Sequence, residues 1–199
     1  MVYKELYSAI AIVLTFVAFI PYISSILQDK IKPHVFSWVI WGTTTFVVFL
    51  AQLEDDGGAG AWPIGVSGII TIFIAFLAYI KRSDITITRI DWMFFIAAMS
   101  SLPLWYFTSD PLWAVVILTT VDFFGFGPTA RKAYIAPYSE SLLFFSLFTV
   151  RNILVIMALE NYSVTTILFP AVIAVACVLL MGIITRRRHV LSTWARICK

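Results

Sequence analysis

The stretch VTTILFPAVIAVACVLLMGIITRRR, residues 164–188, contains no charged side chain until it ends in three consecutive arginines. An α-helix needs about 20 apolar residues to cross the hydrocarbon core of a bilayer, and Val164–Thr185 supplies that length. Arginines that follow such a run favour the cytoplasmic side of the membrane. We therefore predict a transmembrane helix over Val164–Thr185 with its arginines at the cytoplasmic face.

The rest of the chain has the same apolar character. Of its 199 residues 61% are hydrophobic and 13% are charged, whereas soluble domains average about 45–50% apolar and about 25% charged residues. This composition excludes a water-soluble globular domain. Apolar runs separated by polar or turn-rich segments predict seven transmembrane helices, over Ser8–Leu27, Val35–Leu53, Trp62–Ile80, Trp92–Phe107, Leu112–Tyr134, Ser141–Leu159 and Val164–Thr185. We expect an all-α integral membrane fold without a separate soluble domain.

The basic residues alternate from one connection to the next. All of the 14 basic residues except Lys4 and Arg151 lie in or beside the first, third and fifth connections or after the last helix. The positive-inside rule therefore predicts an external N-terminus and a cytoplasmic C-terminus. Short connections are typical of a protein of the bacterial inner (plasma) membrane, while the sequon Asn161–Ser163 in a predicted external loop leaves a eukaryotic origin open.

An internal repeat relates the two halves of the chain. An offset of 107 positions places Phe16, Phe19, Pro21, Val48 and Ala51 on Phe123, Phe126, Pro128, Val155 and Ala158. In each half, a helix with proline near its cytoplasmic end is followed by a short basic connection and an aromatic-rich helix. The sequence predicts a first three-helix bundle over residues 1–86, a linker helix over 87–110, and a second three-helix bundle with a basic tail over 111–199. The linker helix inverts the chain, so that both bundles have the same orientation.

Pro21 and Pro128 occupy matching positions in this repeat. Each proline removes a helical hydrogen bond and allows the helix to bend. A structural kink explains either proline alone, since proline is tolerated in membrane helices. The matched pair favours two hinges for alternating access.

Two charged residues of opposite sign lie well inside predicted spans, namely Asp122 and Arg151. A charge at the centre of a membrane helix costs about 2.5–3.5 kcal/mol on insertion scales, so neither side chain should face lipid. Both residues lie equally far from the connection between their helices, which predicts a common depth near the middle of the membrane. Two interpretations stay open. One is a structural ion pair. The other makes Asp122 a proton-coupling carboxylate or a partner for a substrate amine, with Arg151 binding a substrate carboxylate or restraining the pKa of Asp122.

Three further residues complete the predicted substrate site. Asn152 follows Arg151 with a rotation of about 100° around the helix, so that the two side chains should point in different directions. It offers a donor and an acceptor, either to a ligand or to a neighbouring helix. Trp38 and Trp41 share one helix face. Trp38 fits an interfacial aromatic belt, whereas Trp41, one turn deeper, can stack on a flat or sugar-like substrate.

The sequence lacks the residue clusters that catalysis requires. Its two histidines, His34 and His189, lie near the predicted cytoplasmic surface, and no grouping of His, Cys and carboxylates has the spacing of a metal site. We expect a protein that is not an enzyme, and that has no cofactor, no bound metal and no nucleic-acid partner.

Two matching stretches surround the repeat prolines: Phe19, Ile20, Pro21 and Tyr22 with Lys30, Ser37 and Trp38, and Phe126, Gly127, Pro128 and Thr129 with Ser139, Glu140 and Ser141. Through these residues the chain resembles the PQ-loop and SWEET superfamily of seven-helix transporters. The glutamine that follows each family proline is replaced by Tyr22 and Thr129. The resemblance implies the 3+1+3 arrangement of helices, hinges at the two prolines, and a path lined by the first, second, fifth and sixth helices. Members of the superfamily carry sugars, amino acids or vitamins.

Together these patterns predict a transporter of a small polar metabolite that works by alternating access, with proton coupling and facilitated diffusion both open. The alternative is a ligand-binding membrane receptor or sorting protein on the same scaffold. The expected partners are a small-molecule substrate and the lipid bilayer, with protons as a candidate coupling ion. The oligomeric state is left open.

Overall fold

The computed structural model describes residues 2–29, 33, 35–81, 87, 89–135, 137–139 and 141–197. Within these residues all regular secondary structure is helical, which confirms the predicted all-α class. The helices are α1 (Val2–Leu27), α2 (Val35–Glu54), η1 (Gly58–Gly60), α3 (Trp62–Ile80), α4 (Arg89–Thr108), α5 (Pro111–Ile135), η2 (Pro137–Ser139), α6 (Leu142–Ala158) and α7 (Val164–Ile197), where η marks a single turn of 3₁₀ helix.

The length and apolar composition of the helices indicate a membrane-embedded protein. Four segments are long and apolar enough to cross a bilayer, namely Tyr3–Leu27, Val35–Glu54, Gly58–Ile80 and Val164–Ser192. The other three predicted spans correspond to shorter apolar segments, Trp92–Thr108, Pro111–Gly127 and Leu142–Ala158. Large apolar side chains such as Val13, Phe73 and Val178 point outward from their helices. An outer surface of this kind suits contact with lipid tails rather than with water.

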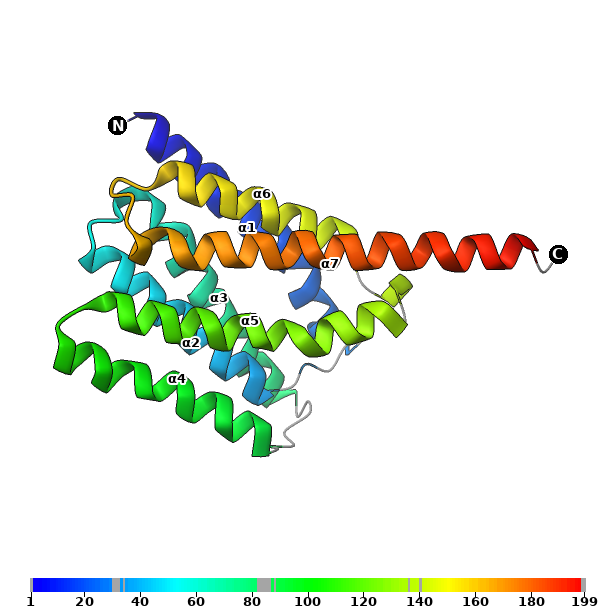
Figure 1. Ribbon diagram of the computed structural model, residues 1–199, viewed down its shortest axis with the longest axis horizontal. Coiled ribbons are helices and arrows are strands. Elements are labelled where there is room, and N and C mark those ends of the chain that lie inside the picture. Colours follow the sequence, from blue (N-terminus) through cyan, green and yellow to red (C-terminus); the bar gives the residue numbers. More distant parts are fainter. Residues whose placement is uncertain are drawn as a thin grey trace.

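Two helices extend more than one turn beyond their predicted spans. The first, α1, begins at Val2 rather than Ser8, with Glu5 in its first turn, where a carboxylate favours the helix dipole. The last, α7, continues past Thr185 to Ile197. No proline or glycine interrupts residues 186–197, and arginines are favourable toward the C-terminal end of a helix. Figure 1 shows the last turns of α7 projecting beyond the other helices.

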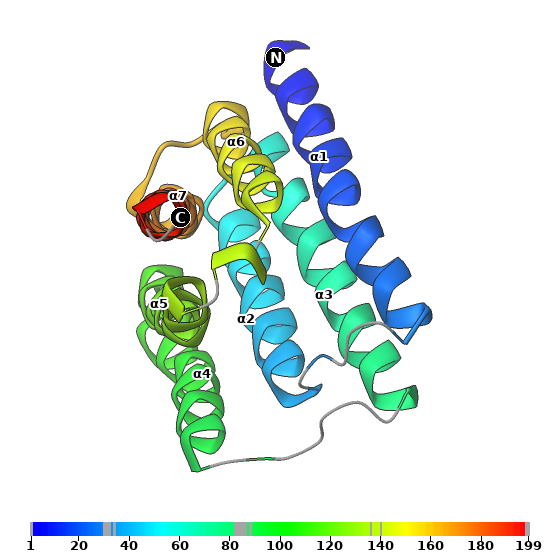
Figure 2. The same ribbon diagram turned by 90° about the vertical axis from the view of Figure 1, so that its right-hand side faces the viewer.

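The helices pack in two rows of three. In the first row α3 contacts both α1 and α2, and in the second α7 contacts both α5 and α6. Figure 2 shows α3 between α1 and α2, and α7 between α5 and α6. The rows meet where α1 contacts α6 and where α2 contacts α5, while α4 packs against α5 and α2. Residues of the first half therefore face residues of the second half along two seams.

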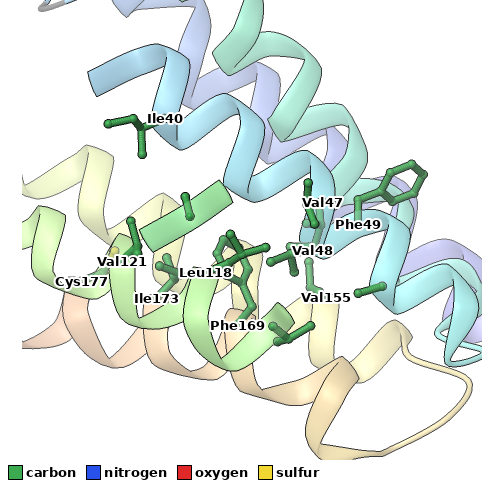
Figure 3. Packing of buried hydrophobic residues seen from close by; sticks show 14 of the residues in the cluster. Ile40, Val47, Val48, Phe49, Leu118, Val121, Val155, Phe169, Ile173 and Cys177 are labelled. Atoms are coloured by element: carbon green, nitrogen blue, oxygen red, sulfur yellow. The ribbon is translucent and has the colours of Figure 1, made fainter. Parts of the chain in front are cut away.

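The main hydrophobic core lies between the two rows. Buried side chains from α2, α5, α6 and α7 meet there, among them Val48, Leu118, Val155 and Ile173 (Figure 3). Within the first row, α2 approaches α3 so closely that a Cβ atom at Gly42 would lie 2.7 Å from Cγ1 of Ile72. Such small residues allow the close helix packing that is common in membranes.

The two ends of the bundle carry opposite charge. The start of α1 and the end of α7 lie at opposite ends (Figure 1). The end that contains the start of α1, here called the acidic end, carries Glu5, Glu54, Asp55, Asp56, Asp110 and Glu160, with Lys4 among them. The other end, here called the basic end, carries Lys81, Arg89, Arg186, Arg187 and Arg188, with Asp29 among them. This separation agrees with the charge alternation of the sequence, and the orientation in a membrane stays a prediction.

Candidate functional site

Asp122 lies in the seam between α5 and α2. Its side chain is 5% exposed, and its Oδ1 atom accepts a 2.8 Å hydrogen bond from the Thr44 hydroxyl. The same hydroxyl lies 3.0 Å from the carbonyl oxygen of Trp41, one turn earlier in α2. A hydroxyl has a single hydrogen, so it serves one of these two acceptors at a time.

Arg151 lies in the other seam, between α6 and the first row. Its side chain is 2% exposed. The guanidinium donates hydrogen bonds to the Thr15 hydroxyl at 3.2 Å, to the Asn152 side-chain oxygen at 2.9 Å and to the Pro63 carbonyl at 2.5 Å. All three acceptors are neutral. A buried cation that is bonded only to neutral groups has no opposite charge to offset its desolvation.

Asp122 and Arg151 do not form an ion pair. Among the described residues the one salt bridge joins Lys81 to Asp29, at 3.1 Å, on the surface of the basic end. The Arg151 side chain extends toward the acidic end, where Pro63 lies in the first turn of α3, whereas Asp122 faces Thr44 in the middle of α2. The structural ion pair is therefore not formed, while the common depth of the two residues stays a prediction.

Asn152 belongs to the Arg151 side of the site. It is fully buried, and its amide donates to the Phe148 carbonyl at 2.7 Å while its oxygen accepts from Arg151. The prediction that the two side chains diverge is wrong, because the long arginine side chain folds back onto its neighbour. We call Thr15, Pro63, Arg151 and Asn152 the Arg151 cluster.

Trp41 belongs instead to the Asp122 side. Its indole lies against α5, since a Cβ atom at Gly125 would come within 2.8 Å of Trp41 Nε1. We call Trp41, Thr44, Asp122 and Gly125 the Asp122 cluster. Trp38 meets the edge of the Trp41 ring at 5.7 Å, and its other ring contacts are with Phe19 and Tyr22 of α1, so it joins an aromatic group at the side of the cluster.

The two predicted hinge prolines lie inside helices. The helix α1 continues past Pro21 to Leu27. The Pro21 carbonyl accepts a 2.8 Å hydrogen bond from the Ser25 hydroxyl. The helix α5 continues through position 128 to Ile135, while the side chain of Pro128 lies outside the described part of the structure. The role of both prolines as hinges stays a prediction.

Thr15 and Thr44 are related by the sequence repeat. Thr15 lies 107 positions before Asp122, and Thr44 lies 107 positions before Arg151. The hydrogen bonds cross this relationship. Thr15 is bonded to Arg151, the repeat counterpart of Thr44, and Thr44 is bonded to Asp122, the repeat counterpart of Thr15. The contribution of Thr15 was not predicted, although the same offset applied to Asp122 leads to it.

A set of hydrogen bonds joins the two halves at the acidic end, and the sequence did not predict it. Asp55 accepts hydrogen bonds from Asn161 through its carbonyl and from Ser163 through its carboxylate. The backbone N–H of Glu160 donates to the Gly57 carbonyl at 3.1 Å. One turn below, the fully buried Gln52 donates to the Thr166 carbonyl at 2.7 Å. We call these contacts the acidic-end latch.

Comparisons with protein-family models, curated proteins and solved structures find no match to this chain. The resemblance to the PQ-loop and SWEET superfamily stays a prediction. The site is therefore interpreted from its own groups. It offers a buried carboxylate beside an indole in one seam, and a buried guanidinium beside an amide in the other.

Proposed function

We propose that this protein transports a small polar metabolite by alternating access between its two halves. The observation that carries the proposal is the pair of hydrogen bonds Thr44–Asp122 and Thr15–Arg151, each of which crosses from one half to the other. Charged groups inside membrane helices are costly and commonly mark a substrate or ion pathway. These two have neutral partners, so stability alone gives no reason for their presence.

The packing supports the 3+1+3 arrangement of the PQ-loop and SWEET resemblance. The third helix of each half lies between the first and second helices of that half, and the seam α1–α6 corresponds to the seam α2–α5 when the halves are exchanged. Parallel repeats of this kind rock against one another around a central site in several transporter classes. The two clusters lie in the corresponding seams.

The latch supports a conformation that is closed at the acidic end. There, Asp55 and Gln52 of the first half are bonded to residues of the second half. At the basic end, Lys81 is bonded to Asp29 within the first half, and Arg187 to the Tyr134 carbonyl within the second half. If the basic end is cytoplasmic, the latch closes the external side, and transport requires it to break.

The position of Thr44 supports proton coupling through Asp122. When the carboxylate is ionised, the Thr44 hydroxyl donates to it. When the carboxyl group is protonated, it donates to Thr44, and the Thr44 hydrogen turns to the Trp41 carbonyl. Both protonation states are thus hydrogen-bonded after the rotation of one hydroxyl, so a proton can be bound and released without leaving a buried group unpaired.

The test is uptake by proteoliposomes that contain the purified protein, with labelled sugars, amino acids, vitamins and nucleosides, with and without an inward pH gradient. We expect saturable uptake of one class, and loss of its response to the gradient in Asp122→Asn. The matched control is Asp110→Asn, because Asp110 caps α5 through the Leu112 N–H at 2.9 Å and asparagine caps equally well. Saturable binding without flux would contradict transport and favour a receptor.

A further inference from the structure

A pocket of about 510 Å³ opens at the acidic end, away from the Asp122 cluster. It lies between α1, the connection around η1 and the connection from α6 to α7, and the lining residues used below are Glu5, Ser8, Ile12, Gly58, Trp62 and Glu160. Small-molecule sites commonly have volumes of about 300–1,000 Å³. The pocket is large enough for a metabolite.

Two carboxylates and an indole line this pocket. Glu5 comes from α1 and Glu160 from the α6–α7 connection, and Trp62 begins α3. No basic residue is among the lining residues within the described part of the chain. Carboxylates and the face of an indole both attract an ammonium group.

Gly58 leaves room for the Glu160 side chain. Its φ of +58° is a left-handed conformation that favours glycine. A Cβ atom at this position would overlap the carboxyl group of Glu160. The glycine thus lets the Glu160 carboxyl group pack directly on the backbone at the wall of the pocket.

Ser8 provides an unpaired polar group on the same wall. Its side chain is 6% exposed, and it lines the pocket. Within the described residues, no hydrogen bond reaches its hydroxyl. Because Ser8 lines the pocket, its hydroxyl is available to donate to or accept from a bound ligand.

The inner wall of the pocket lies next to the Arg151 cluster. Ile12 is one helical turn from Thr15, and Trp62 directly precedes Pro63; these two neighbours are the groups of the first half that bind the Arg151 guanidinium. Charges are weakly screened in a low-dielectric interior. The pocket therefore has negative charge on its lining and a positive charge behind its inner wall.

We propose that this pocket binds a small zwitterion, with the ammonium group at Glu5 and Glu160 and the anionic group turned toward Ser8 and Arg151. A dipolar ligand matches both charges at once, whereas a simple cation is repelled by Arg151 and a simple anion by the carboxylates. The proposal concerns binding and does not depend on transport. The zwitterion is a free solute or the headgroup of a zwitterionic lipid.

Calorimetric titration of the purified, delipidated protein in detergent tests the charge requirement. Three ligands of equal shape are compared: glycine betaine, its cationic relative choline, and the anion 3,3-dimethylbutyrate, in which carbon replaces the ammonium nitrogen. The standard amino acids are titrated alongside. We expect saturable binding of at least one zwitterion, and tenfold weaker binding of analogues that lack either charge. Equal binding of cation and zwitterion, or no zwitterion bound, overturns the proposal.

Variants locate the site. Glu5→Gln and Glu160→Gln should each weaken zwitterion binding about tenfold, because each variant removes one negative charge from the wall that faces the ammonium group. Gly58→Ala should have the same effect by displacing Glu160 with its charge intact. Glu54→Gln removes a carboxylate of the acidic end that lies outside the pocket, and should leave affinity unchanged. Uniform losses in all four variants, or none, contradict this location.

Nanodiscs separate the two sources of the zwitterion. In phosphatidylglycerol discs, a free zwitterion should bind as it does in detergent. If the natural occupant is a lipid headgroup, discs that contain phosphatidylethanolamine should compete with the free ligand and weaken its binding. If it is a free solute, binding should be the same in both kinds of disc. Loss of binding in both kinds of disc would overturn the proposal.

Discussion

Thr15 and Arg151 are joined by a 3.2 Å hydrogen bond across one seam, and the residues that the repeat places at their positions, Asp122 and Thr44, are joined by a 2.8 Å bond across the other. In both bonds the charged partner comes from the second half of the chain. The two contacts are thus equivalent in position and opposite in charge. A bundle that only needed stability would place apolar residues at such positions, because paired apolar side chains avoid the cost of desolvating a charge.

Replacing Arg151 by methionine should preserve stability. The variant loses three hydrogen bonds, but it also removes a buried cation that has no anionic partner, and such replacements are often neutral or stabilising. Thr15 keeps its bond to the Ala11 carbonyl and Asn152 keeps its bond to Phe148. We expect the free energy of unfolding to change by less than about 1 kcal/mol, or about 2–4 °C in melting temperature, while uptake is lost.

Thermal unfolding in detergent and proteoliposome uptake measure these two quantities on the same preparation. Arg151→Lys is the matched control, since it keeps the charge but loses the fork of donors that reaches three acceptors. If the melting temperature of Arg151→Met falls by more than 10 °C while the folded fraction shows normal uptake, the guanidinium is structural.

Thr44→Val should destabilise the protein through Asp122. The valine has nearly the same shape as threonine but leaves the buried carboxylate without its donor, at a cost of about 1–3 kcal/mol. In the double variant Thr44→Val/Asp122→Leu most of this loss should be recovered, because no unpaired carboxylate remains. Chemical denaturation of the wild type, Thr44→Val, Asp122→Leu and the double variant gives the coupling energy between the two residues. Thr120→Val is the control, since Thr120 is exposed and bonds only within α5, to the Val116 carbonyl. Additive effects would show that Thr44 and Asp122 do not interact.

The sequence predicts the helices better than it predicts the site. Long apolar runs are a strong signal for helices. Turn-forming residues between them, such as Asp110 and Pro111, separate consecutive helices, so most predicted boundaries lie within a few residues of the observed ones. The extensions of α1 and α7 were missed because polar residues beyond a span continue a helix without an apolar signal. Helix positions therefore follow from local sequence.

The site depends on contacts that local sequence does not contain. Asp122 and Arg151 were found because charges are rare in membrane helices. Of the two interpretations that the sequence leaves open, the ion pair is not formed, because the arginine side chain reaches away from its own backbone to bind Pro63. The latch was missed because Asp55 and Asn161 look like ordinary loop residues until the fold brings the two loops together.

A disulfide across the latch should stop transport. The side chains of Asp55 and Ser163 are in hydrogen-bond contact across the latch, which makes these two positions the candidates for a cysteine pair. The experiment uses a Cys198→Ser background, since the remaining cysteine, Cys177, is buried. We expect oxidised Asp55→Cys/Ser163→Cys to lose uptake and a reductant to restore it, while each single variant responds to neither treatment. Continued uptake with the crosslink complete would show that the halves do not separate at this end.

Gly125 and Gly127 offer a matched pair of substitutions in α5. A Cβ atom at Gly125 would lie 2.8 Å from the Trp41 indole nitrogen, whereas nothing lies within 4 Å of a Cβ atom at Gly127. Alanine is the better helix former by about 1 kcal/mol at both positions. We expect Gly127→Ala to be neutral or stabilising, and to leave uptake unchanged. Gly125→Ala should push Trp41 away from Asp122 and lower uptake at least tenfold. Tryptophan fluorescence reports the displaced indole, and equal uptake by the two variants would remove Trp41 from the substrate site.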